Sequence, residues 1–118
     1  MADLATLQNV RQLAQVRPPN TNTMSVLSAA VKRKVVVMSM VLCNTTTSAA
    51  TFSIFLDKDG TTYDQTTALF YGITLAANTT EMIELHEGLP LDPQVSGNLA
   101  LQVGTANAIT FTINGLEL

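Results

Sequence analysis

Three carboxylates and a glycine between positions 57 and 64 form the first group whose residue types could do chemistry. Asp57, Asp59, Gly60 and Asp64 resemble a calcium loop, in which oxygen ligands at alternate positions surround the cation. The match fails where Thr61 stands in place of a third ligand, and Gly60 is out of step with the glycine of such a loop. The segment therefore predicts a hairpin turn without a metal ion.

The single histidine and the single cysteine are the other candidates for chemistry. His86 lies between Glu84 and Glu87, but a transition-metal site would need a second imidazole or a tighter set of carboxylates. Cys43 ends an apolar segment, whereas a reactive thiol needs a nearby base and an electropositive setting. No G-x-S-x-G elbow and no glycine-rich phosphate loop occurs. The sequence predicts no enzyme, no cofactor and no catalytic or metal-binding residue.

One basic run, Lys32-Arg33-Lys34, is a candidate contact for an acidic partner surface or for nucleic acid. Its ordinary interpretation is a solvated entrance to a strand. The chain has 6 Lys and Arg against 9 Asp and Glu, which gives a net charge of -3. Three cations in an acidic domain would bind phosphates weakly and with strong salt dependence. We therefore expect no specific nucleic-acid partner.

Composition restricts the class of protein further. The chain has 118 residues, of which 47% are hydrophobic and 13% are charged. This is one domain with enough apolar residues for a core, so the sequence is not intrinsically disordered. Its one cysteine excludes an internal disulfide. No apolar run approaches the roughly 20 residues that cross a bilayer, and no secretory leader is visible. We expect no membrane partner and a protein kept in the cytosol or in an assembly built there.

The first 22 residues differ from the rest of the chain. Leu4, Leu7, Val10 and Leu13 fall near helical spacing, and Pro18-Pro19 ends any helix. So short an apolar face cannot bury itself without a partner surface. We predict an N-terminal arm over residues 1–22 whose four apolar residues dock on a neighbouring subunit.

Residues 23–118 are typical of β-structure throughout. Apolar and polar residues alternate in short runs separated by turn residues every 8–12 positions. Residues 35–43 are apolar on both faces, which predicts a central strand. Strict alternation places Val35, Val37, Ser39, Val41 and Cys43 on one face and Val36, Met38, Met40 and Leu42 on the other. We expect an all-β fold, an antiparallel β-sandwich or jelly roll of seven or eight strands with an N-terminal arm. The expected strands cover residues 24–28, 35–43, 50–57, 69–75, 82–85, 99–103 and 109–114.

Four blocks of this domain resemble a known group of proteins. They read VLCNTTTSAATFSIF (41–55), DKDGTTY (57–63), ITLAANTT (73–80) and NLALQVGTANAITFTINGLEL (98–118). In this order the blocks are similar to small structural proteins encoded in the morphogenesis regions of tailed bacteriophages. The similarity covers residues 23–118 and consists of strand and turn residues. It implies a β-sandwich virion protein, and it brings no catalytic residues.

Within that class, the first interpretation is a capsid decoration (cement) protein that binds and stabilises the mature head. Its partners would be the major capsid protein or other virion proteins, and its location the virion, after assembly in the host cytoplasm. The quasi-threefold positions of an icosahedral shell favour a homotrimer. The second interpretation is a neck, tail or baseplate component. The third is a carbohydrate- or receptor-binding module, for which only Tyr63, Phe70 and Tyr71 are plausible aromatics and no Trp is present.

Overall fold

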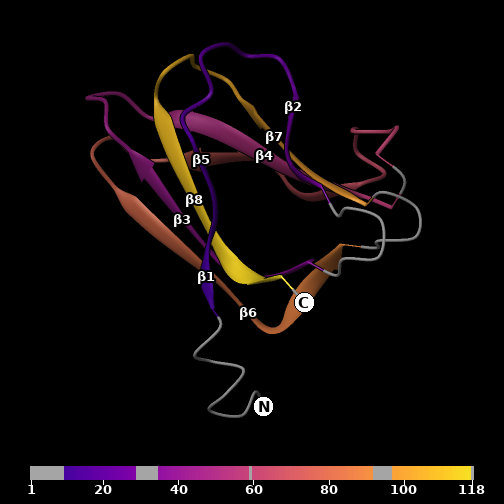
Figure 1. Ribbon diagram of the computed structural model, residues 1–118. Helices are drawn as coiled ribbons and strands as arrows, with labels where there is room; N and C mark the ends of the chain where they lie inside the picture. The colour runs from indigo at the N-terminus through magenta and orange to yellow at the C-terminus, as the bar shows by residue number, and fades with distance from the viewer. Residues whose placement is uncertain (1–9, 29–34, 59, 92–96, 118) are drawn as a thin grey trace.

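The computed structural model describes residues 10–28, 35–58, 60–91 and 97–117. In this part of the chain the secondary structure consists of eight β-strands (Figure 1). The strands are β1 (Arg11–Val16), β2 (Met24–Ser28), β3 (Val35–Asn44), β4 (Ala50–Asp57), β5 (Ala68–Leu75), β6 (Thr80–Leu91), β7 (Asn98–Val103) and β8 (Ile109–Glu117). None of the described segments is a helix long and apolar enough to cross a bilayer.

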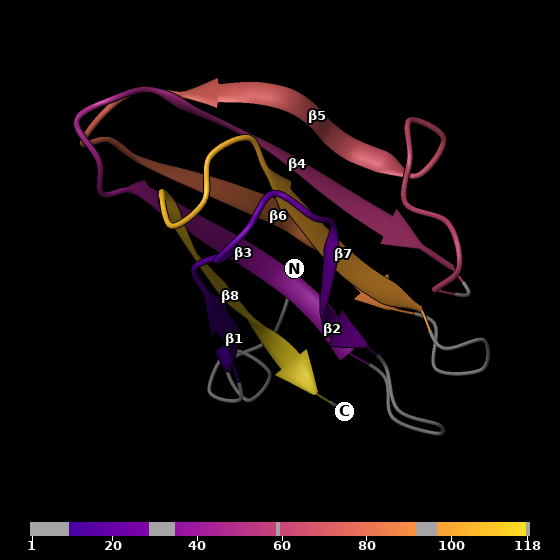
Figure 2. The same cartoon turned by 90° about the horizontal axis from the view of Figure 1, so that it is seen from above.

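The strands form two four-stranded antiparallel sheets, which Figure 2 shows as two layers. The order is β1-β8-β3-β6 in one sheet, called sheet A, and β2-β7-β4-β5 in the other, called sheet B. β1 pairs with β8, β2 with β7, β3 with β6 and β4 with β5. The first half of the chain thus runs antiparallel to the second half, as one long hairpin rolled into two sheets. This is the jelly-roll order, and the predicted β-sandwich is confirmed.

The hydrophobic core lies between the layers, because alternate side chains of each strand point to the same face. Phe52 of β4 is at its centre. Its ring centroid lies 6.2 Å from that of Phe111 in an edge-to-face arrangement and 6.4 Å from that of Phe70. These contacts join the two sheets through Phe111 of sheet A and the two rings of sheet B.

The face alternation that we predicted for β3 is wrong beyond its third residue. That alternation places Met40 opposite Val37, but the pairing with both neighbouring strands shifts register between Val37 and Ser39. A β-bulge changes the phase of a strand by one residue. As a result Val35, Val37, Met40 and Leu42 all face the core with at most 2% exposure. The central position of the strand is confirmed, while its outer face is half-buried rather than covered.

The helical spacing predicted for the N-terminal segment is wrong over Arg11–Val16, which form the edge strand β1. β1 pairs with β8 and packs Leu13 and Val16 against the core. An extended segment beside a free sheet edge satisfies its backbone groups, whereas an isolated short helix is marginal. This part of the predicted arm therefore belongs to the sandwich, and residues 1–9 lie outside the described residues.

Candidate functional site

The interaction residues predicted from the sequence are only partly placed by the structure. Five of them, Leu4, Leu7, Lys32, Arg33 and Lys34, lie outside the described residues. Val10 is 37% exposed just before β1, and Leu13 within β1 is half-buried against the core of its own chain. The role of all seven residues in docking stays a prediction.

The acidic segment after β4 forms a capped loop rather than the tight hairpin turn that we predicted. β5 begins only at Ala68, so ten residues separate it from Asp57 at the end of β4. The Asp57 carboxylate is buried and accepts hydrogen bonds from the backbone N–H groups of Thr61 and Thr62, at 2.6 Å each. Its charge is thus used to hold the loop, as in other Asp-capped turns.

Asp64 closes the same loop by a second local network. Its carboxylate accepts hydrogen bonds from the hydroxyl and the backbone N–H of Thr66. These bonds favour the charged form and hold the pKa of Asp64 below its ordinary value. No group of three or more His, Cys, Asp or Glu residues that could hold a metal ion occurs among the described residues.

An aromatic cluster lies on the outer face of sheet B, away from the core. The buried ring of Phe55 contacts Tyr63 of the capped loop, with centroids 6.4 Å apart, and Tyr71 of β5, with centroids 6.3 Å apart. Tyr71 meets Phe55 edge to face and is 53% exposed. The cluster therefore offers a supported aromatic surface to solvent. Phe70, the third aromatic singled out in the sequence, instead packs half-buried against the core.

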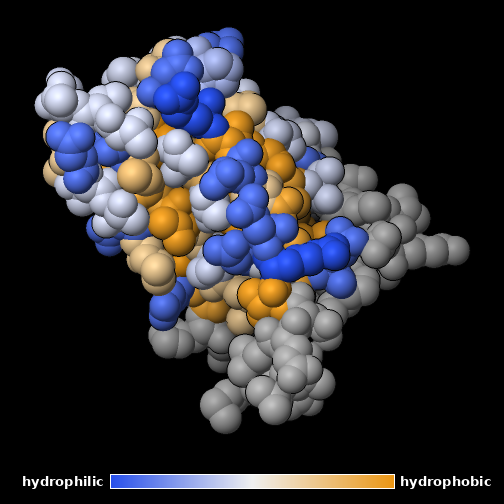
Figure 3. Space-filling view, turned by 60° about the vertical axis from the view of Figure 1, so that its left-hand side comes forward, coloured by the Kyte–Doolittle hydropathy of each residue, from blue (hydrophilic) through white to orange (hydrophobic). Residues whose placement is uncertain are grey.

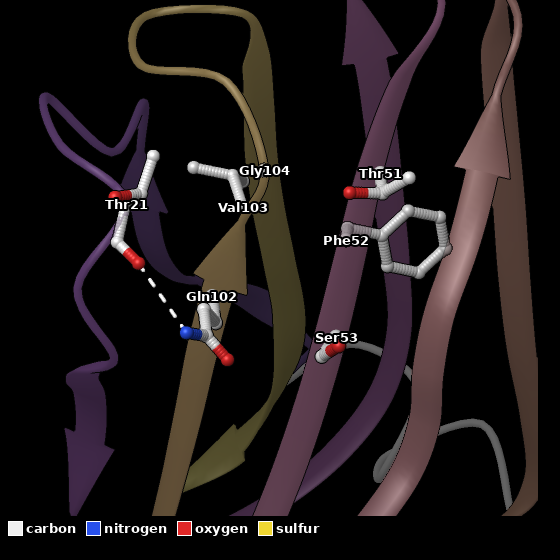
Figure 4. Close-up of a pocket in the computed structure, with 7 residues that line it drawn as sticks. All are labelled: Thr21, Thr51, Phe52, Ser53, Gln102, Val103 and Gly104. Carbon is white, nitrogen blue, oxygen red and sulfur yellow. Dashed lines mark hydrogen bonds between the residues drawn. The ribbon is translucent and has the colours of Figure 1, made fainter.

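A polar pocket of about 270 Å³ occurs in the same sheet (Figure 4). It lies where β4 and β7 run side by side under the connection between β1 and β2. The Gln102 amide nitrogen donates a hydrogen bond to the backbone oxygen of Thr21 at 3.3 Å. All of its lining residues are uncharged. They are Thr21, Thr51, Phe52, Ser53, Gln102, Val103 and Gly104.

The pocket and the aromatic cluster are joined by an irregularity in β5. Pairing of β5 with β4 shifts register beside Ser53, and Gly72 has a left-handed φ of 60°. The Gly72 N–H donates to the hydroxyl oxygen of Ser53 at 2.9 Å. Since Ser53 lines the pocket and Gly72 follows Tyr71, one hydrogen bond ties the two features together. A bulge of this kind commonly redirects a side chain.

Apolar surface is also open along the gap between β5 and β6, which are edge strands of opposite sheets. A cavity of about 380 Å³ there is lined by Phe52, Phe70, Ile73, Thr74, Leu75, Glu81 and Ile83. Leu69, Tyr71 and Ile73 of β5 and Met82 of β6 are exposed by 41 to 59%. Figure 3 brings the left-hand side of Figure 1 forward, where hydrophobic surface lies open between hydrophilic side chains. Exposed apolar surface of this kind is typical of contact with other molecules.

The comparisons with known proteins concern the fold. The sequence matches no known family model and no curated protein. Among solved structures, a chain of the T13 particle of infectious bursal disease virus is similar over 91% of this chain, with a TM-score of 0.50 and 14% identity. A chain of the Gx strain of that virus is similar over 90% of this chain, with a TM-score of 0.43 and 15% identity. This chain spans 30% of the length of each, and the likeness to the first shows a similar fold alone.

The sequence indicated part of this outer face. Tyr63 and Tyr71 were singled out as plausible platform aromatics, and both lie in the cluster. Ser53 and Gln102 were not singled out, although their alternation with core residues already indicated the solvent face of their strands. Their register, Ser53 opposite Gln102, is a long-range feature that no local pattern reveals.

Proposed function

We propose that this chain is a structural protein of a virus particle and, within that class, a capsid decoration protein of a tailed bacteriophage. The observation that carries the proposal is the eight-stranded jelly roll, which is similar over 91% of the chain to a chain of a viral particle. Jelly rolls recur in viral capsid proteins. This is an argument by fold analogy, supported by the sequence resemblance to phage morphogenesis proteins.

The physical properties of the described residues fit a binding role. They hold no metal-ligating cluster, and the buried Asp57 carboxylate serves its own loop. A protein that binds the assembled shell and not its free subunits stabilises the shell by mass action. A homotrimer at a quasi-threefold position would add avidity to modest contacts. The open apolar surface on β5 and β6 supports contact with neighbouring molecules. We propose that this chain has no enzymatic activity.

Quantitative mass spectrometry of purified particles, scaled to the major capsid protein, tests the proposal. We expect copies by the hundred, as a decoration protein requires. A handful of copies would contradict decoration and support the neck, tail or baseplate interpretation. Absence from the particle would overturn the structural role altogether.

The predicted docking of the N-terminal residues has a direct test that leaves β1 intact. A variant carrying Leu4→Asp and Leu7→Asp should lose at least about tenfold in affinity for purified mature heads, because two buried leucines contribute several kcal/mol. Co-sedimentation with the heads measures the loss. Far-UV circular dichroism should stay unchanged, and Lys58→Ala, an exposed change in the capped loop, serves as the control. Unchanged head binding by the double variant would remove these residues from the interface.

A further inference from the structure

We propose that the outer face of sheet B carries a binding site for neutral saccharides, formed by Tyr71 and the polar pocket beside it. This inference goes beyond the structural role and does not depend on it. It starts from one juxtaposition: the half-exposed Tyr71 precedes Gly72, whose N–H donates to the hydroxyl oxygen of Ser53, and Ser53 lines a pocket of uncharged hydrogen-bonding groups.

The pocket supplies groups suited to sugar hydroxyls. Hydroxyl and amide side chains both donate and accept hydrogen bonds, as sugar hydroxyls do. Ser53 is 7% exposed. Its hydroxyl oxygen accepts the hydrogen bond from the Gly72 N–H, so its O–H can still donate to a ligand. Gln102 uses its amide nitrogen on Thr21, and Figure 4 shows its amide oxygen on the side away from Thr21. The Thr51 hydroxyl lies on the opposite wall.

Tyr71 supplies the apolar half of the site. The C–H faces of a pyranose ring pack on aromatic rings, which present a flat apolar surface with a polar tip. The edge-to-face contact with buried Phe55 limits how far the Tyr71 ring can turn, so its orientation is set before a ligand arrives. Preorganisation of this kind reduces the entropy lost on binding.

Gly72 fixes the position of Tyr71 relative to the polar pocket. Its φ of 60° belongs to the left-handed region, and a Cβ built there would meet nothing within 4 Å. The glycine is therefore required by its backbone conformation and not by lack of space. With the Gly72 N–H bonded to Ser53, the strand irregularity holds Tyr71 at the side of the pocket.

The electrostatics of the site select a neutral ligand. Among the described residues, none that lines the pocket is charged, so none of them would pair with a carboxylate, sulfate or phosphate group. The carboxylate at the end of β4, Asp57, already accepts hydrogen bonds from two backbone N–H groups of its own loop. Acidic sugars would lose hydration without gaining a counter-charge.

The test is a glycan microarray carrying neutral and sialylated or uronic-acid glycans, probed with the full-length protein. Binding to a set of neutral glycans, and not to acidic forms of the same core, is the expected result. The neutral glycans retained on the array are then titrated into ¹⁵N-labelled protein. Perturbed amide signals should map to β4, β5 and β7 around the pocket. No retained neutral glycan, or signals that shift only on sheet A, would overturn the proposal.

Two variants distinguish the loss of stacking on the Tyr71 ring from a loss of folding. Tyr71→Ala should weaken binding by about twofold to tenfold, since aromatic stacking contributes about 0.5–1.5 kcal/mol. Tyr71→Phe should retain most of the affinity, because the ring is kept. Met82→Ala is the matched control, as Met82 is a large apolar residue exposed by 59% on the other sheet. Equal binding by Tyr71→Ala and the parent, or equal losses by Tyr71→Ala and Met82→Ala, would contradict the site. Particle association is a separate readout and tests the structural role alone.

Discussion

Replacing Gly115 with alanine is expected to lower the free energy of unfolding by about 3 kcal/mol, at the upper end of the usual cost of overpacking. The added methyl group would overlap the backbone carbonyl oxygen of Val36 and would lie 3.0 Å from the Leu13 side chain. That oxygen belongs to β3, which is held by β8 on one side and β6 on the other. Relief would require moving a central strand. Urea denaturation followed by far-UV circular dichroism measures the loss, since the chain has no Trp.

Gly72→Ala is the informative comparison. Here the added methyl group meets open space, and the cost comes from the left-handed φ alone, about 1–2 kcal/mol for a residue with a Cβ. We therefore expect Gly115→Ala to be the more damaging of the two. The reverse order would mean that β8 does not approach β3 as closely at Gly115 as the structure shows.

The alternation of residue types was sufficient to predict the class of fold. Alternating runs in residues 50–57, 99–103 and 109–114 correspond to β4, β7 and β8, whose apolar residues form most of the core. Burial of one face fixes the register of such strands strongly. The pairing of the first strand with the last could not be predicted in the same way, because it joins residues about a hundred positions apart.

Local irregularities account for most of the differences between the strands predicted from the sequence and the strands of the structure. The bulge between Val37 and Ser39 reverses the face of every later residue of β3, and a strand that is apolar on both faces does not reveal this change in its sequence. β6 continues through residues 88–91 although Pro90, which cannot donate a ladder hydrogen bond, lies among them. Pro90 is accommodated because β6 is an edge strand, in which an N–H can be absent without loss of a ladder bond.

The candidate site shows the same division between local and long-range information. Two of its aromatic residues, Tyr63 and Tyr71, are plausible platform residues from the sequence alone, and the structure places both in the cluster. Its polar half depends on Ser53 facing Gln102 across two strands and on a bulge at Gly72. Neither has a signature in the order of residues, since a serine and a glutamine at a strand surface are ordinary.

Asn44→Asp is the second change with a large expected effect, a loss of about 3 kcal/mol in the free energy of unfolding. Asn44 is 1% exposed at the end of β3. Its amide nitrogen donates to the backbone oxygens of Ser48 and Leu75, at 3.0 and 3.1 Å, and its amide oxygen accepts from the N–H and hydroxyl of Thr46. Aspartate has almost the same shape but would turn a carboxylate oxygen toward two carbonyl oxygens.

The pH dependence of the free energy of unfolding distinguishes this mechanism from a simple loss of packing. Burial and facing carbonyls should raise the pKa of the introduced carboxyl above its unfolded value of about 3.9. The loss in the free energy of unfolding is then complete above the raised pKa. This loss becomes smaller as the pH falls through the raised pKa, because protonation of the carboxylate restores one donor. Asn107→Asp, the same change at an exposed turn residue, should stay within about 0.5 kcal/mol of the parent at every pH. A loss at Asn44 that is equal at all pH values would show that the two donated hydrogen bonds are not what holds this turn to β5.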